Sequence, residues 1–417
     1  MQSRKVGSQS EHTRTVVVAV DISKDTFTAY FRCLLTGKQR SVRSYPYHRK
    51  GVEQLYDEAQ KFAAENGSMH MILGLESTGV YHLGMVEFFK DKPVEIQQVN
   101  TLHVKRMKDI TDNTPTKTDW KDPRVIADLI ELGRGLRMGV AEEVFLELRQ
   151  LTHARERVIA DYTAVGNKLS NLVHILFPEF HRFFTNIHGS TARKMLKMYP
   201  LPSQIGQLGE NDLYDFLKKE SRGRYNREFA EGLFEAAKAS LGCVQGAQNY
   251  ITEIHVLIDL CELMYKAKKS YEDRIYSLIT ELPLAKVLLS FKGVGPMTTA
   301  TILGEYTGFE GFETIAEVLK YAGMNLTECS SGKLHGRRRL AKRGRPLIRK
   351  ILYFAAMNMV RKGNEFHDKY QRYINAGKPK VAALMAIARK ILRIMFAMSK
   401  SGQSFNKEYA QKYLKAA

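Results

Sequence analysis

Short apolar runs alternate with helix-periodic segments along the N-terminal third of the chain. Val16–Val20 (VVVAV) is a β-branched run, and Thr26–Leu34 alternates apolar with polar positions, so the two segments predict an antiparallel strand pair joined by the turn DISKD. Residues 70–75 (HMILGL) predict a buried strand, and residues 94–99 (VEIQQV) predict another.

Helical periodicity lies between these strands, at 51–65 and at 80–90. A further short helix is predicted at 122–133, with Asp122 as its N-cap and Pro123 at the first helical position. Strands that alternate with helices in this way predict an α/β domain built on a mixed sheet.

The middle of the chain has a different periodicity. Residues 141–176 carry apolar side chains on a heptad-like stripe with charged residues elsewhere, and residues 248–280 repeat the pattern. Two long helices are predicted to pair there as a coiled coil. The insert between them, 180–246, is expected to be helical.

The last third is predicted to be mainly α. The segment LSFKGVGPMTTATILGEYTG (289–308) predicts a helix end, a Gly-x-Gly turn and a second helix, and further helices are expected near 346–362 and 379–399. The pattern therefore divides the chain into a disordered leader (1–14), an α/β domain (15–140), a helical spacer (141–283), a mainly α domain (284–405) and a tail (406–417).

The amino-acid composition excludes several classes of protein. Hydrophobic residues make up 44% and charged residues 26% of the 417 positions, as in a folded chain. The four cysteines form no C-x-x-C pair, so neither a disulfide framework nor a structural zinc site is indicated, and a reducing cytosol fits. No run of 18 apolar residues and no apolar signal segment is present, so we expect neither membrane spanning nor secretion.

The basic excess is unevenly distributed. The net charge is +20 overall, with 21 basic and 17 acidic residues in 1–140, 18 of each in 141–280, and 25 basic against 9 acidic in 281–417. The run 331–350 holds nine basic residues and no acidic one. A solvated charged face has the same composition, but apolar residues interleave this run, which favours a folded surface that binds nucleic-acid phosphates.

Acidic residues end several of the α/β elements. Asp21 follows the first apolar strand, Glu76 follows the central strand, and Asp119 and Asp122 stand three apart where a loop enters a helix. A sheet can bring such carboxylates together, and they then raise one another's pKa unless a divalent cation such as Mg²⁺ neutralises them. Taken singly, each acid has an ordinary explanation as a turn residue, a helix cap or a surface acid; as a set they predict a metal site for phosphodiester chemistry.

Two features of the last third are open to more than one interpretation. The Gly293-Val294-Gly295 turn resembles a helix-hairpin-helix, whose backbone N–H groups bind phosphate, although paired glycines also serve as routine caps. Ser330 and Ser331 precede the basic run, and Ser-Ser-Gly in isolation is an ordinary turn because a serine needs an activating base or metal to act as a nucleophile.

These residues together resemble one family, the insertion-sequence 110/1111 transposases with a DEDD motif and a RuvC-like N-terminal domain. Three N-terminal groups match in order and spacing: VAVDISK, ESTGVY and KTDWKD, which contain Asp21, Glu76, Asp119 and Asp122. The C-terminal segments GVGP, YAGM and KRGRPLIR look like the second domain of the same proteins. The resemblance covers residues 15–140 and 284–405.

The resemblance implies an RNase H-type fold whose four acids hold Mg²⁺, and a C-terminal serine that joins them in a composite site and makes a transient phosphoserine link to DNA. By position the serine is Ser331, with Ser330 as the alternative register. It also implies that the protein binds donor and target double-stranded DNA, with a structured non-coding guide RNA, the bridge RNA, supplying specificity through base pairing. We also expect dimers that pair into a tetramer. The expected location is the cytoplasm of a prokaryote, at the nucleoid. The expected nucleic-acid-binding residues are Gly293, Gly295, Lys333, Arg337, Arg338, Arg339, Lys342, Arg343 and Arg345.

The residues alone are also compatible with two other functions. One is a RuvC-like junction nuclease that hydrolyses DNA with the acids alone, in which Ser331 is a turn residue. The other is a non-enzymatic helix-hairpin-helix protein, whose function would not depend on the acids. A covalent protein–DNA adduct separates the transposase from the nuclease.

Overall fold

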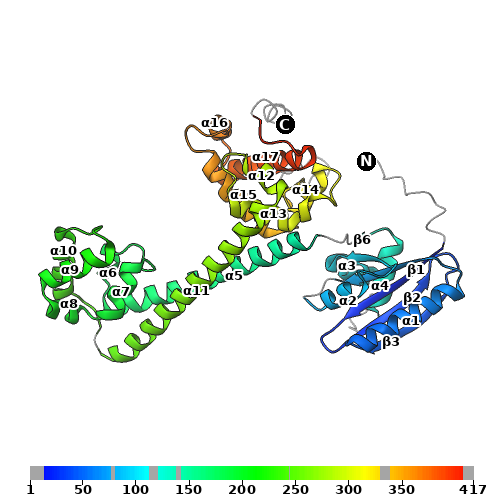
Figure 1. Ribbon diagram of the computed structural model, residues 1–417, viewed down its shortest axis with the longest axis horizontal. Helices are drawn as coiled ribbons and strands as arrows, with labels where there is room; N and C mark the ends of the chain where they lie inside the picture. Colours follow the sequence, from blue (N-terminus) through cyan, green and yellow to red (C-terminus); the bar gives the residue numbers. More distant parts are fainter. Residues whose placement is uncertain are drawn as a thin grey trace. The chain divides into compact units, whose positions relative to one another are not determined.

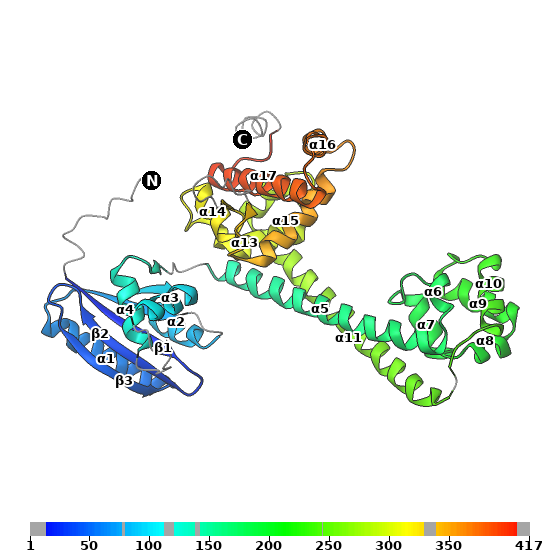
Figure 2. The same cartoon turned by 180° about the vertical axis from the view of Figure 1, so that it is seen from behind.

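The computed structural model describes residues 14–76, 80–111, 121–137, 142–243, 245–328 and 339–406. The chain forms two compact units, Met1–Val140 and Ala141–Ala417, drawn from two sides in Figures 1 and 2. The predicted leader and tail lie almost wholly outside the described residues. None of the described helices is both long and apolar enough to cross a membrane.

The first unit contains a six-stranded mixed sheet in the order β3-β2-β1-β4-β5-β6. The two predicted strands form an antiparallel pair, and β1 is parallel to β4, which is parallel to β5. The mixed α/β prediction is confirmed. The strands are β1 (Thr15–Ile22), β2 (Thr26–Cys33), β3 (Gln39–Pro46), β4 (His70–Glu76), β5 (Glu95–Val99) and β6 (Leu136–Arg137).

Two edge strands, β3 and β6, were not predicted. In β3 only Val42 and Tyr45 are buried, and its other residues are polar or charged apart from Pro46, so the segment looks like a surface loop in sequence. β6 has only two residues, both exposed. Pairing with β2 and β5, and not local pattern, makes these segments strands.

Helices cover both faces of the sheet, which explains the uninterrupted apolar run of β1. Alternate residues Val16, Val18 and Val20 pack with α1 (Arg49–Glu65) and α2 (His82–Phe89). Val17 and Ala19 face the opposite core, with α3 (Thr101–Thr111) and α4 (Asp122–Glu131).

Helix α4 lies very close to β4 at Gly74. A Cβ on Gly74 would meet Ile130 Cδ1 at 2.1 Å and Ile126 Cγ2 at 3.2 Å, so a larger residue would push the helix away from the sheet. The helix begins at Asp122, and Lys121 occupies the N-cap position without a side-chain capping bond. The prediction that Asp122 is the N-cap is therefore wrong by one residue. The Asp122 carboxylate instead contacts Lys108.

The second unit is organised on two long helices, α5 (Glu143–Leu176) and α11 (Ala247–Glu281). They run antiparallel, because Leu148 shares a core with Ile275 while Leu169 shares another with Ile254. Ion pairs connect them: Arg274 Nε donates to Glu147 Oε1 at 2.7 Å. The predicted pair of long helices is present (Figure 1).

The insert between these helices is a small helical module with its own apolar core. Phe177, Phe180 and Phe184 lie at its centre, each at most 2% exposed. Its helices are α6 (Phe180–Phe183), α7 (Ser190–Met198), α8 (Pro202–Leu208), α9 (Glu210–Ser221) and α10 (Arg227–Lys238).

The C-terminal helices form a separate core around α17, which is buried along most of its length. Phe145 and Leu148 of α5 and Ile279 of α11 belong to this core, so the long helices contribute to its stability. The elements are α12 (Pro283–Leu289), α13 (Pro296–Tyr306), a 3-10 turn (Thr307–Phe309), α14 (Ile315–Tyr321), the strand pair β7 (Leu326–Thr327) and β8 (Arg339–Leu340), α15 (Pro346–Met359), α16 (His367–Asn375) and α17 (Lys380–Ser401).

Glu305 is a buried acid at the junction of α13 and α5, and the residue is 1% exposed. His153 Nε2 lies 2.7 Å from Glu305 Oε1, Arg345 Nε lies 3.7 Å from Oε2, and Arg149 donates to the Glu305 carbonyl at 2.8 Å. Burial alone raises a carboxyl pKa, but the hydrogen bond with His153 and the charges of Arg345 and Arg149 outweigh it and lower the pKa of Glu305. The ionised carboxylate therefore stabilises the fold.

We expect Glu305→Gln to lower the free energy of unfolding by about 2 kcal/mol, less than the ~3–5 kcal/mol of a fully buried pair because His153 and Arg345 reach solvent. The carboxylate contributes fully above its ordinary pKa of about 4.3 and loses its contribution as the pH falls through the lowered value. Urea unfolding of both proteins should therefore show a difference at pH 7 that shrinks below about pH 4. A difference independent of pH would show that packing, and not charge, is responsible.

Candidate functional site

Asp21 is the penultimate residue of β1 and Glu76 is the last residue of β4, and these two strands are parallel neighbours. Val20 is paired with Leu75 in the ladder between β1 and β4, so Asp21 and Glu76 follow at the same level of the sheet. Side chains alternate along a strand, and both acids share the face of Ala19 and Gly74, the face that α4 covers. The sheet therefore brings together two acids that lie 55 residues apart in sequence.

Asp122 joins them as the first residue of α4. Carboxylate oxygens of Asp21, Glu76 and Asp122 all lie within 4.8 Å of one another. Glu76 is 6% exposed, and the two aspartates are half-buried. Because α4 packs tightly on the sheet at Gly74, its N-terminus is held at the strand ends, and the predicted meeting of these three acids is observed.

The cluster is electrostatically unfavourable without a counter-ion. Burial raises the pKa of Glu76, and the nearby carboxylates of Asp21 and Asp122 raise it further. A hydrogen bond with Thr101 and the charge of Lys108 oppose these effects without cancelling them. Lys108 of α3 forms an ion pair with Asp122. Lys108 thus offsets part of the charge of the three acids.

The donor set fits a hard divalent cation. Three carboxylates at mutual distances below 4.8 Å supply oxygen ligands, and a divalent charge would relieve the repulsion that raises the Glu76 pKa. Asp119, the fourth predicted acid, lies outside the described residues, in the segment 112–120.

The predicted serine and part of the basic run also lie outside the described residues, in 329–338. That segment is bounded by the short antiparallel pair of β7 and β8, in which Leu326 is opposite Leu340. The predicted residues in it are Ser330, Ser331, Lys333, Arg337 and Arg338.

The remaining predicted basic residues are all exposed. The Lys342 backbone N–H donates to the Gly323 carbonyl at 3.0 Å. The Arg345 guanidinium lies 5.5 Å from the centre of the Tyr321 ring, and its Nε donates to the Tyr321 hydroxyl at 3.1 Å. The backbone of Lys342 is thus fixed at Gly323, and the Arg345 guanidinium contacts Tyr321 and the buried Glu305. These exposed basic residues are Arg339, Lys342, Arg343 and Arg345.

The glycine turn lies between α12 and α13, as predicted. Gly293 has φ +95°, and a Cβ there would meet Met359 Cγ at 2.5 Å, so only glycine fits. Gly295 is the N-cap of α13, and a Cβ there would meet nothing within 4 Å. Both glycines are exposed. The turn therefore leaves open space beside the N-terminus of α13.

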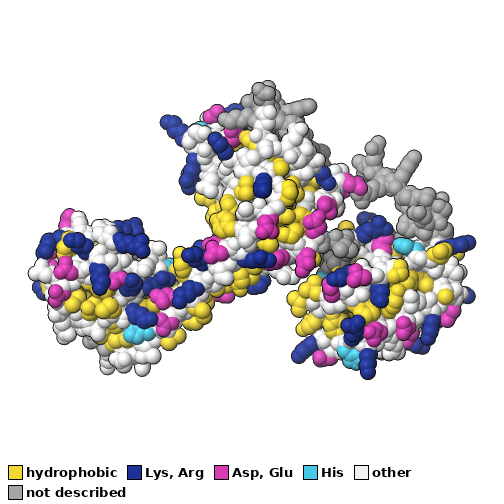
Figure 3. All heavy atoms as spheres, in the orientation of Figure 1, with side chains coloured by type: hydrophobic (Ala, Val, Ile, Leu, Met, Phe, Trp, Pro, Cys, Tyr) yellow, Lys and Arg dark blue, Asp and Glu magenta, His cyan; other side chains and the backbone are white. Residues whose placement is uncertain are grey.

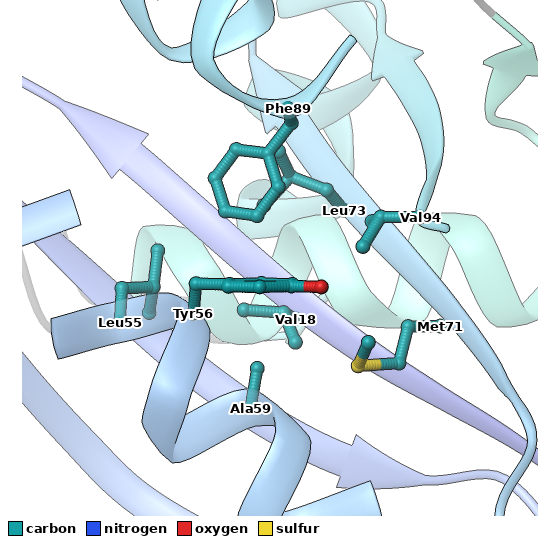
Figure 4. A pocket seen from close by; sticks show the side chains of 8 residues that line it. All are labelled: Val18, Leu55, Tyr56, Ala59, Met71, Leu73, Phe89 and Val94. Carbon is teal, nitrogen blue, oxygen red and sulfur yellow. The ribbon is translucent and has the colours of Figure 1, made fainter. Parts of the chain in front are cut away.

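Sequence reasoning missed Lys108 and Thr101, which contact the acids from α3. The segment TLHVKRMKDIT contains several basic residues, and nothing in its pattern singles out Lys108. A small apolar pocket also lies in this unit, but on the opposite face of the sheet, between Tyr56, Met71 and Leu73 (Figure 4). Its lining is hydrophobic, so it plays no part in the acidic site.

Comparison with known proteins gives matches to both parts of the chain. Residues 18–178 match the sequence model of DEDD transposases of the IS110 type, and residues 285–371 match the model described as transposase IS116/IS110/IS902 family.

Three relatives come from bacterial insertion elements. The 43.6 kDa protein of IS110 from Streptomyces coelicolor is 25% identical over 396 residues, covering 93% of this chain and 94% of the relative. The 44.8 kDa protein of IS116 from Streptomyces clavuligerus is 24% identical and covers 69% and 72% of the two chains. The 42 kDa protein of IS900 from Mycobacterium paratuberculosis is 24% identical and covers 68% and 71%.

The first matched region contains Asp21, Glu76 and Asp122, and the second contains Gly293 and the basic run. The two regions together span more than half of the chain in the order that the sequence resemblance predicts. With a relative that aligns over nearly the whole length, these matches show that the chain belongs to the IS110/IS116 family of insertion-element transposases.

Proposed function

We propose that this transposase is a Mg²⁺-dependent, RNA-guided recombinase that cuts and rejoins DNA through a phosphoserine intermediate. The observation that carries the proposal is the convergence of Asp21, Glu76 and Asp122 within 4.8 Å in a chain of a transposase family. A buried acid such as Glu76, with a raised pKa between two further acids, has a poor electrostatic environment unless a cation is present.

Asp21, Glu76, Asp119 and Asp122 would hold the metal. A bound Mg²⁺ supplies positive charge to the oxygens of a phosphodiester under attack. The protein's own contribution is to fix the ligands: β1 and β4 set two of them by register, and the packing of α4 at Gly74 sets Asp122. Thr101 holds Glu76 by a hydrogen bond.

Ser331 is proposed as the nucleophile, with Ser330 as the alternative. Its Oγ would form a bond to a DNA phosphorus while the bond from that phosphorus to a bridging DNA oxygen breaks, and the released DNA hydroxyl takes up the proton. Attack by a hydroxyl of a second DNA end would reverse the step and release the serine. No phosphodiester is lost to water, which distinguishes this reaction from nuclease cleavage.

The basic C-terminal third would bind the phosphate backbone. Support comes from the open space beside Gly295 at the N-terminus of α13, and from the exposed side chains of Arg339, Lys342, Arg343 and Arg345. The proposed contacts include Gly293 and the undescribed Lys333, Arg337 and Arg338. Backbone contacts carry no sequence information, so a guide RNA would select donor and target DNA by base pairing.

A composite site made from acids and serine in different domains is most simply built between subunits. We therefore propose dimers that pair into a tetramer on two DNA duplexes. This assembly would allow the acids of one subunit to act with the serine of another.

The metal site can be tested by thermal unfolding. Mg²⁺ should raise the unfolding temperature of the wild type and leave that of Glu76→Gln unchanged, because the variant lacks a ligand. Without metal, Glu76→Gln should be more stable than the wild type, since the raised pKa shows that its charge is unfavourable in the folded state. Glu131→Gln, an exposed acid on the same helix as Asp122, is the matched control. Full recombination in EDTA would refute the metal requirement.

The nucleophile can be tested by denaturing gel electrophoresis with end-labelled DNA. Ser331→Ala should abolish the covalent protein–DNA band and recombination while DNA and RNA binding stay close to wild type, because only the attacking oxygen is removed. An unchanged band would exclude Ser331, and Ser330→Ala would then be the next variant.

Mixing Ser331→Ala with Asp119→Asn protein tests the shared site. Partial recovery of recombination is expected if acids and serine come from different subunits. DNA hydrolysis without any adduct would favour the junction nuclease, and full function of Asp119→Asn alone would favour a non-enzymatic binding protein.

A further inference from the structure

Helix α3 presents a lysine to the acidic site. Thr101, Val104 and Lys108 are three and four residues apart, so they lie along one face of the helix. Val104 is buried in the core that α3 shares with α4, which holds this face against α4. Figures 1 and 2 show the two helices side by side in the first unit. The packing of α3 thus places Lys108 at the N-terminus of α4.

Lys108 contacts the acids directly. Its ammonium group forms an ion pair with the Asp122 carboxylate, and its charge also acts on Glu76. At the other end of the same helix face, Thr101 forms a hydrogen bond with Glu76. The Lys108 side chain is 34% exposed and the Asp122 side chain is 20% exposed, so both remain accessible to a ligand from solvent. Lys108 is therefore a member of the site.

The proposed function requires the acidic site to accept two ligands of opposite charge. The carboxylates attract a divalent cation, but they repel the phosphate of a DNA substrate. Lys108 reduces the charge of the three ionised acids from −3 to −2, so one divalent cation would make the group neutral. Without Lys108 the same group would stay negative and would oppose an approaching phosphate.

The surface of the first unit has a much smaller basic excess than the last third of the chain. Residues 1–140 contain 21 basic and 17 acidic residues, whereas residues 281–417 contain 25 and 9. On the face of the first unit drawn in Figure 3, dark blue and magenta side chains are interspersed. Attraction for a phosphate at the acids therefore has to come from groups at the site itself, and Lys108 is placed to supply it.

We propose that Lys108 is a phosphate-binding residue of the acidic site. It holds Asp122 in the metal-free protein, and it binds a DNA phosphate when Asp122 is a metal ligand. A lysine suits this exchange because its ammonium group is a compact charge on a flexible four-carbon chain. The inference rests on the proposed function, since it needs both the divalent cation and the DNA substrate.

The first measurement is Mg²⁺ binding to the full-length protein by isothermal titration calorimetry. Lys108→Met should bind Mg²⁺ roughly tenfold more tightly than the wild type, because the repulsion between the ammonium group and the cation is removed. Lys105→Met removes the same charge from an exposed position of α3 and should bind Mg²⁺ like the wild type. Unchanged or weaker Mg²⁺ binding by Lys108→Met would overturn the proposal, because the lysine would then only support the fold of the site.

The second measurement is the affinity of the same proteins for a DNA duplex of unrelated sequence, in Mg²⁺ and in EDTA. In Mg²⁺, Lys108→Met should bind the duplex several-fold more weakly than the wild type, and its salt slope should fall by about one for the lost phosphate contact. In EDTA the two proteins should differ less, because Asp122 then holds Lys108. Lys108→Arg keeps the charge and should restore the affinity in Mg²⁺.

Tighter Mg²⁺ binding together with weaker DNA binding distinguishes this role from a structural one, because a damaged fold would weaken both. The proposal is refuted if Lys108→Met binds DNA like the wild type, or if its loss of affinity is the same in Mg²⁺ and in EDTA. If the wild type binds neither Mg²⁺ nor DNA, the proposed function itself fails. If the wild type binds both and Lys108→Met behaves identically, only the role of Lys108 fails.

Discussion

Close packing of α4 against the sheet is the interaction on which the acidic site depends. Three carboxylates within 4.8 Å repel one another, so other interactions must hold together the elements that carry them. Gly74 allows Ile126 and Ile130 of α4 to contact β4 directly, and the apolar residues of α4 and β1 form one core. Burial of this apolar surface outweighs the repulsion, so the fold itself holds the three acids together.

In the second unit, apolar packing likewise holds like charges together, but there the charges are positive. The α17 helix is buried along most of its length in an apolar core, and this packing fixes Arg389 and Lys390 beside Arg393 despite their like charges. Both clusters have pKa values displaced in the direction that disfavours the charged form. Groups with pKa values displaced in this way are common at functional sites.

Glu305 is a buried acid whose charge is compensated within the same chain, although its Oε2 has no hydrogen-bond partner among the described residues. Its pKa moves in the stabilising direction because His153 and Arg345 supply compensating charge. It also links α5 to α13 and to the start of α15 by contacts that span 152 residues of sequence. The acids of the acidic cluster differ from Glu305, because neighbouring carboxylates raise the pKa of Glu76 whereas cations lower that of Glu305.

The sequence by itself determined the central elements and the identity of the acids. Apolar runs and helical periodicity are local properties, so β1, β2, β4, β5 and the two long helices could be predicted from them. Asp21, Glu76 and Asp122 were recognised because each ends or begins such an element. The family resemblance, carried by short motifs, was likewise confirmed by the matches.

Only the tertiary structure decided which groups share an environment. The edge strand β3 depends on pairing with β2, and the role of Lys108 depends on α3 lying against the N-terminus of α4. The group of cations on α17 appears in sequence only as an excess of basic residues. Burial and mutual repulsion arise from contacts between segments distant along the chain, and no local pattern encodes them.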